Sequence, residues 1–136
     1  MKHLLDTQIF LWFISADRRL SAGMRDAIRD LSNEVYLSVV SLWEATVKYH
    51  LGKLPLPQPP DVYLPIQRQQ HQIASLSLDE ASVCKLANLP SIHRDPFDRM
   101  LICQALAHGL IITTMDDVIS AYPVPVKEVM LKKNVH

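Results

Sequence analysis

Apolar residues along this chain fall into two patterns, short continuous runs and repeats at helical spacing. The short runs predict strands over residues 3–5, 35–38, 73–76, 110–114 and 122–129. The repeats between them predict helices that begin near residues 7, 21, 41, 61, 79 and 95. Strands that alternate with helices predict an α/β protein, in which helices cover both faces of a central parallel sheet as a three-layer α/β/α sandwich.

The helix that begins near residue 95 has the clearest boundaries in the chain. Asp95 is a good N-cap, and Pro96 suits the first helical position because its missing N–H has no partner there. Gly109 suits the position just after the last turn. Asp98 falls in the first turn, where acids are favoured by the helix dipole, so either acid alone could be only a helix cap.

The helix after the second strand carries a capping signature. Ser41 followed three residues later by Glu44 is typical of a capping box, which predicts a helix start at Ser41. In that arrangement the Glu44 carboxylate only reaches back to the Ser41 amide. Lys48 follows Glu44 by four residues and could be a helix salt-bridge partner.

Composition fits one folded domain over residues 1–136, with residues 131–136 as a frayed tail. The chain is 49% hydrophobic and 21% charged, as expected of a globular protein. Its net charge of zero neither supports nor excludes an RNA substrate. No Cys/His zinc spacing, signal peptide or membrane-length apolar run is seen in the sequence, so we expect a cytoplasmic protein.

Acids far apart in the sequence are expected to meet at one edge of the predicted sheet. In parallel α/β folds, strand carboxyl ends and the following helix starts share an edge, where ligands bind. Four acids fall at such positions: Asp6, Glu44, Asp98 and Asp116. Carboxylates crowded together repel one another, and a hard divalent cation with oxygen ligands offsets that repulsion. The pattern therefore predicts a Mg²⁺ or Mn²⁺ site that hydrolyses phosphodiester bonds.

These motifs resemble the PIN domain, most closely the VapC-like ribonuclease toxins of prokaryotic toxin–antitoxin pairs. The resemblance rests on Asp6-Thr7, Ser-Leu-Trp-Glu44-Ala, Asp-Pro-Phe-Asp98-Arg-Met-Leu-Ile and Thr-Met-Asp116. It covers nearly the whole chain and keeps the order and approximate spacing of the four acids.

The resemblance implies a Mg²⁺- or Mn²⁺-dependent endoribonuclease, a homodimer and a small antitoxin partner that inserts near the active site. It implies metal binding by Asp6, Glu44, Asp98 and Asp116. Thr114 matches a hydroxyl position that can orient a water on the metal. Asp95 is kept mainly as an N-cap. Asp117 stays an alternative to Asp116, because a one-residue slip would select it.

Several residues have competing interpretations. Lys48, Arg94 and Arg99 could contact RNA phosphate, yet each has a plausible surface or salt-bridge role. We expect Trp12 and Trp43 to be core or dimer contacts. The histidines show no ligand spacing, and surface or packing roles are expected for all of them: His3, His50, His71, His93, His108 and His136.

Other functions fit the pattern less well. A PIN fold that acts only by binding a partner is one alternative, although the intact acids count against it. A receiver-like signalling domain needs paired acids after the first strand, and a haloacid-dehalogenase-type phosphatase needs Asp-x-Asp there. Gln8 occupies the second acidic position of that motif, and no acid pair follows the first strand.

Overall fold

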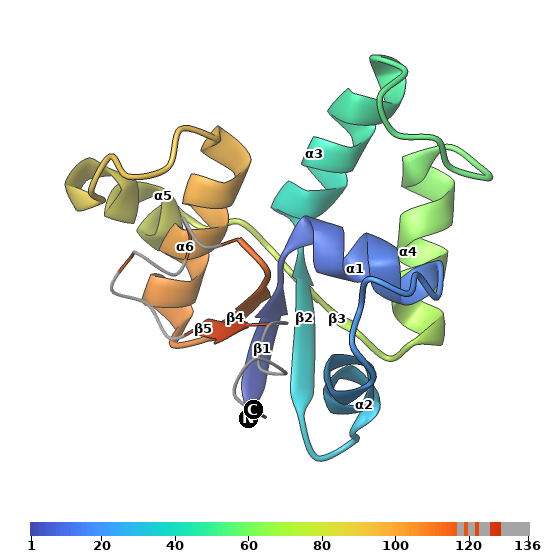
Figure 1. Ribbon diagram of the computed structural model, residues 1–136. Helices are drawn as coiled ribbons and strands as arrows, with labels where there is room; N and C mark the ends of the chain where they lie inside the picture. Colours follow the sequence, from blue (N-terminus) through green and yellow to red (C-terminus); the bar gives the residue numbers. More distant parts are fainter. Residues whose placement is uncertain (117–118, 120–121, 123–125, 129–136) are drawn as a thin grey trace.

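A five-stranded parallel sheet forms the centre of the protein (Figure 1), seen in a computed structural model that describes residues 1–116, 119, 122 and 126–128. Its order is β3-β2-β1-β4-β5. The strands are β1 (Lys2–Leu5), β2 (Glu34–Ser38), β3 (Ala74–Leu76), β4 (Ile111–Thr114) and β5 (Val126–Glu128). The helices are α1 (Thr7–Ile14), α2 (Ala22–Arg29), α3 (Val39–His50), α4 (Pro60–Gln70), α5 (Glu80–Lys85) and α6 (Pro96–His108), with a 3₁₀ turn η1 (Leu86–Asn88).

Two hydrophobic clusters cover opposite faces of the sheet. Successive side chains of a strand point to opposite faces, and Leu5 packs with residues of α1, α2 and α4 whereas Leu4 packs with residues of α6. Figure 1 shows α1, α2 and α4 on one side of the sheet and α5 and α6 on the other. The predicted three-layer α/β/α sandwich is therefore confirmed.

Helix α3 begins three residues earlier than the capping signature predicted. Ser38 is its N-cap, and the Ser38 hydroxyl accepts a 3.0 Å hydrogen bond from the Val40 amide. The same hydroxyl donates to Gln104 Oε1 of α6 at 2.5 Å. Ser41 lies inside the helix, where its hydroxyl accepts a 2.7 Å bond from Thr7 Oγ1. The predicted capping box is wrong, because the end of β2 leads directly into the helix.

Other boundaries follow the predictions closely. Asp95 caps α6, and Gly109 ends it in the left-handed conformation with φ 65°. Pro65 lies within α4 without ending it. The last strand, β5, is at the sheet edge as predicted, and its described residues are Val126–Glu128. Asp117 and the predicted tail 131–136 lie outside the described residues. Within the described part of the chain, no helix has the length and apolar character needed to cross a membrane.

Candidate active site

A cavity of about 510 Å³ opens where the carboxyl end of the sheet meets the first turns of the helices. Oxygen-bearing acids dominate its polar lining: Asp6, Glu44, Asp95, Asp98 and Asp116. Lys48 and Lys53 also line it. The structure thus brings the four acids predicted to converge, together with the N-cap Asp95, around one cavity.

Asp6 lies directly after β1 and caps α1. Its Oδ1 accepts a 3.1 Å hydrogen bond from the Gln8 amide, as an N-cap does. Its Oδ2 accepts a 2.6 Å bond from the Thr114 hydroxyl. The residue is buried, and burial raises the pKa of the Asp6 carboxyl despite both hydrogen bonds. The charges of Glu44 and Asp116 raise this pKa further.

Thr114, the last residue of β4, links two of the acids. While its hydroxyl donates to Asp6, the Thr114 oxygen accepts a 2.9 Å hydrogen bond from the Asp116 amide. Thr114 is fully buried, so this arrangement fixes the turn that presents Asp116 to the cavity. The hydroxyl proton is directed to a carboxylate. Orientation of a water by this proton, as the resemblance implied, would require Thr114 to give up that bond.

Glu44 reaches the cavity from α3 and has one unpaired oxygen. Its Oε2 pairs with Lys48 Nζ at 2.5 Å. Its Oε1 is buried and has no hydrogen-bond partner among the residues that the structure describes. The residue is only 5% exposed. A buried carboxylate oxygen without a partner is costly unless a cation or donor completes it, so Oε1 is suited to bind a cation or a hydrogen-bond donor.

Asp98 lies in the first turn of α6, and the Asp98 amide donates to the N-cap Asp95 at 3.2 Å. Burial, reinforced by neighbouring negative charges, raises the pKa of the Asp98 carboxyl from 3.8 to about 7. Those charges belong to Asp6, Asp95 and Glu44, while His93 opposes the rise. Asp95 Oδ1 also accepts from the Phe97 amide at 2.8 Å. Asp95 thus has the capping role predicted for it.

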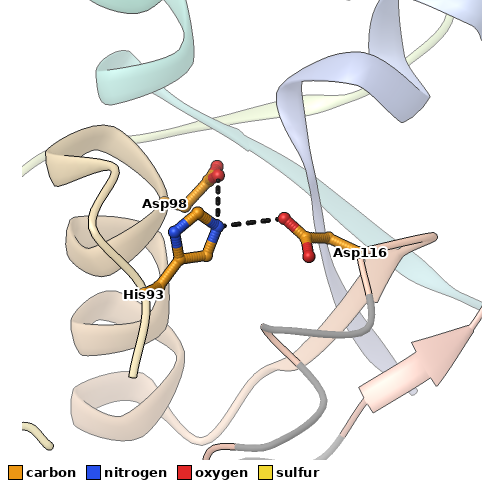
Figure 2. Close-up of side chains that lie close together, drawn as sticks. All are labelled: His93, Asp98 and Asp116. Carbon is orange, nitrogen blue, oxygen red and sulfur yellow. Dashed lines mark hydrogen bonds and ion pairs between the residues drawn. The ribbon is translucent and has the colours of Figure 1, made fainter. Parts of the chain in front are cut away.

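His93 lies between two of the acids, a position that sequence reasoning missed (Figure 2). Its Nε2 is 3.0 Å from Asp98 Oδ2 and 2.9 Å from Asp116 Oδ2. Donor atoms of these three residues lie within 4.8 Å of one another, close enough to hold a metal ion. Asp6 and Glu44 do not belong to this tight group. The available signal was the place of His93 two residues before the Asp95 N-cap, where a side chain can fold over the first helical turn.

The sequence model of the PIN domain family matches residues 3–125. This chain belongs to the PIN domain family. Ribonuclease VapC16 from Mycobacterium tuberculosis is 39% identical over 57 residues, a match that covers 42% of this chain and 40% of that relative.

Solved structures share the PIN fold at low sequence identity. VapBC2 from Rickettsia felis, bound to a DNA fragment from the VapBC2 promoter, matches with a TM-score of 0.72 and 14% identity over 94% of this chain and 98% of that one. DNA-bound VapBC from Salmonella typhimurium matches with a TM-score of 0.67 and 18% identity over 95% and 98%. These likenesses show that the fold is the one the resemblance implied.

The three basic residues predicted to contact RNA phosphate lie in different settings. Lys48 lines the cavity. Burial lowers the Lys48 pKa, but the hydrogen bond to Glu44 and the negative charges of Glu44, Asp95 and Asp98 together outweigh burial and leave that pKa raised. Arg94 is exposed. Arg99 Nη1 donates to the carbonyls of Pro90 and His93 at 3.1 and 3.3 Å, which ties the loop before α6 to the helix.

The two tryptophans also differ from each other. Trp12 packs against the core and lines the cavity. Trp43 is 56% exposed and touches Phe97 edge to face, with ring centroids 4.8 Å apart. Trp43 is therefore a surface residue of this chain, and of its two predicted roles only the dimer contact stays open.

Proposed function

We propose that this PIN domain is an endoribonuclease that depends on Mg²⁺ or Mn²⁺ and hydrolyses phosphodiester bonds in RNA. The unpaired, buried Oε1 of Glu44 in a cavity of carboxylates carries the proposal. Lys48 neutralises only one of the acids directly. Burial first, and neighbouring negative charges after it, raise the pKa of Asp6 and that of Asp98, so a cation in the cavity would favour the ionised form of both.

The donor set fits a hard cation. Carboxylate oxygens are the protein ligands that Mg²⁺ and Mn²⁺ prefer. Asp6, Glu44, Asp98 and Asp116, which all line the same cavity, would hold the ion directly or through its bound waters. A divalent ion bound there supplies Lewis-acid activation of a water and stabilisation of negative charge on a phosphate.

The chain's own residues have supporting roles in this proposal. Thr114 fixes the orientation of Asp6 and of the turn that carries Asp116. Lys53, with Lys48, places positive charge at the cavity wall, which attracts an RNA phosphate to an otherwise acidic site. Arg94 is exposed and free to extend that contact along the RNA backbone. Arg99 would first have to release the loop carbonyls that it binds.

We further propose that the protein is the toxin of a toxin–antitoxin pair, works in the cytoplasm as a homodimer and is inhibited by a small antitoxin protein. The similarity to a protein named a ribonuclease supports the activity, and the similarity to VapBC assemblies supports a protein partner. Exposed Trp43 is a suitable contact for a second chain.

RNA cleavage by purified protein tests the activity. Wild-type protein should cleave RNA with Mg²⁺ or Mn²⁺ and stop when EDTA is added. Asp98→Asn should fold and lose cleavage by at least about a hundredfold, as expected when a group essential to a metal site is removed. The matched control is Asp26→Asn, which makes the same change on the exposed face of α2 and should keep full activity.

Two results would contradict the proposal. Full activity of Asp98→Asn would show that Asp98 is not an essential residue of the active site. Folded wild-type protein without any metal-dependent cleavage would favour the alternative, a PIN fold that acts only by binding. Growth arrest on expression, absent for Asp98→Asn, separates a toxin from such a module.

A further inference from the structure

The His93 ring makes a hydrogen bond with each of its two nitrogen atoms. Nε2 faces the carboxylates of Asp98 and Asp116 at 3.0 and 2.9 Å. Nδ1, on the other side of the ring, accepts a 3.1 Å hydrogen bond from the Asp95 amide. The ring therefore lies between a backbone donor and a pair of acceptors, and Figure 2 shows it between the two acids.

The backbone contact determines which nitrogen carries the proton. An amide N–H can only donate, so Nδ1 must present its lone pair to Asp95. A neutral imidazole then holds its proton on Nε2, where both facing carboxylates can accept it. In this arrangement Nε2 offers no lone pair to a metal ion. His93 is thus oriented as a hydrogen-bond donor to the acids and cannot serve as a ligand through Nε2.

The loop that carries His93 is fixed in place. The Tyr122 hydroxyl, on a residue only 3% exposed, accepts from the amides of His93 and Ile92 at 2.6 and 3.1 Å. Arg99 donates to the His93 carbonyl at 3.3 Å. Because both the amide and the carbonyl of His93 are hydrogen-bonded, the backbone holds the ring over the first turn of α6.

We propose that His93 is a built-in competitor of the metal: its Nε2–H bridges Asp98 Oδ2 and Asp116 Oδ2, and an ion bound by these two oxygens would take the place of that N–H. This inference rests on the proposed metal-dependent function. It makes His93 a positioning residue, which keeps the two carboxylates together without an ion and weakens the binding of the ion that replaces it.

Paired substitutions separate the two sides of the ring. In His93→Asn, the side-chain oxygen can replace Nδ1 as acceptor for the Asp95 amide, and nothing replaces Nε2. In His93→Gln, the longer side chain can bring an amide N–H back to the acids. His108→Asn is the control elsewhere in the chain. His108 Nε2, like that of His93, lies within hydrogen-bond distance of a carboxylate, in this case Asp79 at 2.9 Å.

Calorimetric titration of the metal-free protein with Mn²⁺ gives the decisive measurement. His93→Asn should bind Mn²⁺ at least about tenfold more tightly than wild type, the factor expected when a hydrogen bond to a charged group no longer competes. His93→Gln should bind close to wild type, and His108→Asn should not differ from it. Weaker binding by His93→Asn would make His93 a ligand, and unchanged binding would make it a bystander; either result overturns the inference.

Nitrogen-15 NMR of the wild-type histidines tests the same idea without any substitution. Without metal, the His93 ring should show its proton on Nε2, and Mg²⁺ should shift the Nε2 signal while leaving His108 unchanged. A proton on Nδ1 would overturn the inference even if the variants fail to fold. Absence of metal binding by the wild type and every variant would instead reject the proposed function itself.

Discussion

Thr114 Oγ1 donates a 2.6 Å hydrogen bond to Asp6 Oδ2 across 108 positions of sequence. Asp6 directly follows β1 and Thr114 ends β4, and these two neighbouring parallel strands pair through Leu5 and Thr113. The bond therefore joins the first acid of the cavity to the strand that leads into the last. Both partners are buried, so the bond forms away from water, where a missing partner is most costly.

Thr114→Val should weaken both stability and metal binding. The valine has nearly the same shape but leaves Asp6 Oδ2 without its donor and the Asp116 amide without its acceptor. We expect unfolding by denaturant to show a loss of about 1–3 kcal/mol, together with weaker Mn²⁺ binding in calorimetry. Thr46→Val is the control, since the Thr46 hydroxyl donates to the Leu42 carbonyl of its own helix. Equal metal affinity of the Thr114 variant and wild type would contradict the role assigned to this hydroxyl.

The metal-free protein should become less stable as pH rises from about 4 to 7. Over this range the unfolded chain has Asp98 ionised, whereas the folded state keeps it protonated because its folded pKa is about 7. The folded state therefore binds more protons, and the free energy of unfolding falls with pH by an amount on the order of 3 kcal/mol. The raised pKa of Asp6 acts in the same direction.

Thermal unfolding at pH 5 and pH 8 measures this effect. Asp98→Asn should show a smaller pH dependence than wild type, since the titrating group is gone. Saturating Mg²⁺ should reduce or reverse the slope in wild type, because an ion bound to the carboxylate favours its ionised form. A slope that is identical in Asp98→Asn and wild type would show that Asp98 is not the group responsible.

Lys48→Gln should destabilise the metal-free protein, because it leaves the Glu44 carboxylate buried without its charged partner. The loss should be on the order of 1 kcal/mol, since Lys48 is half exposed and water replaces part of the interaction. Added Mn²⁺ should raise the melting temperature more in this variant than in wild type. Arg19→Gln, which removes the exposed Arg19–Asp17 pair, is the control and should change little. If Mn²⁺ stabilised the variant no more than wild type, Glu44 would not be part of the metal site.

Ser38→Ala should cost more than an ordinary helix cap. Ser38 caps α3 by accepting from the Val40 amide, and it donates to Gln104 of α6. Ser38, Val40 and Gln104 are all buried. We expect a loss of about 2 kcal/mol in denaturant unfolding. Ser21→Ala is the matched control, because Ser21 caps α2 with a single bond to the Met24 amide in a half-buried setting. Its loss should be about 1 kcal/mol. Equal losses would show that the bond to Gln104 adds nothing.

Local sequence patterns determined most of the secondary structure. Asp95, Pro96 and Gly109 predicted both ends of α6, because capping and chain direction depend on neighbouring residues. Alternation of strands and helices predicted the parallel sandwich, and that topology alone brought Asp6, Glu44, Asp98 and Asp116 to one edge. These features need no knowledge of how distant side chains pack.

Tertiary structure decided how the acids are arranged within that edge. Ser38 donates to Gln104, and α3 begins at this end of β2 rather than at Ser41. Glu44 therefore does not form the predicted capping box, and its Oε1 has no partner among the described residues. Tyr122 fixes the loop that places His93 between Asp98 and Asp116. Each of these contacts joins segments far apart in the chain, and each forms only if the positions of its two side chains are correct to within about an ångström. Hydrophobic periodicity carries no information at that scale, so the sequence by itself determined where the acids gather, and only the fold decided which partners they have.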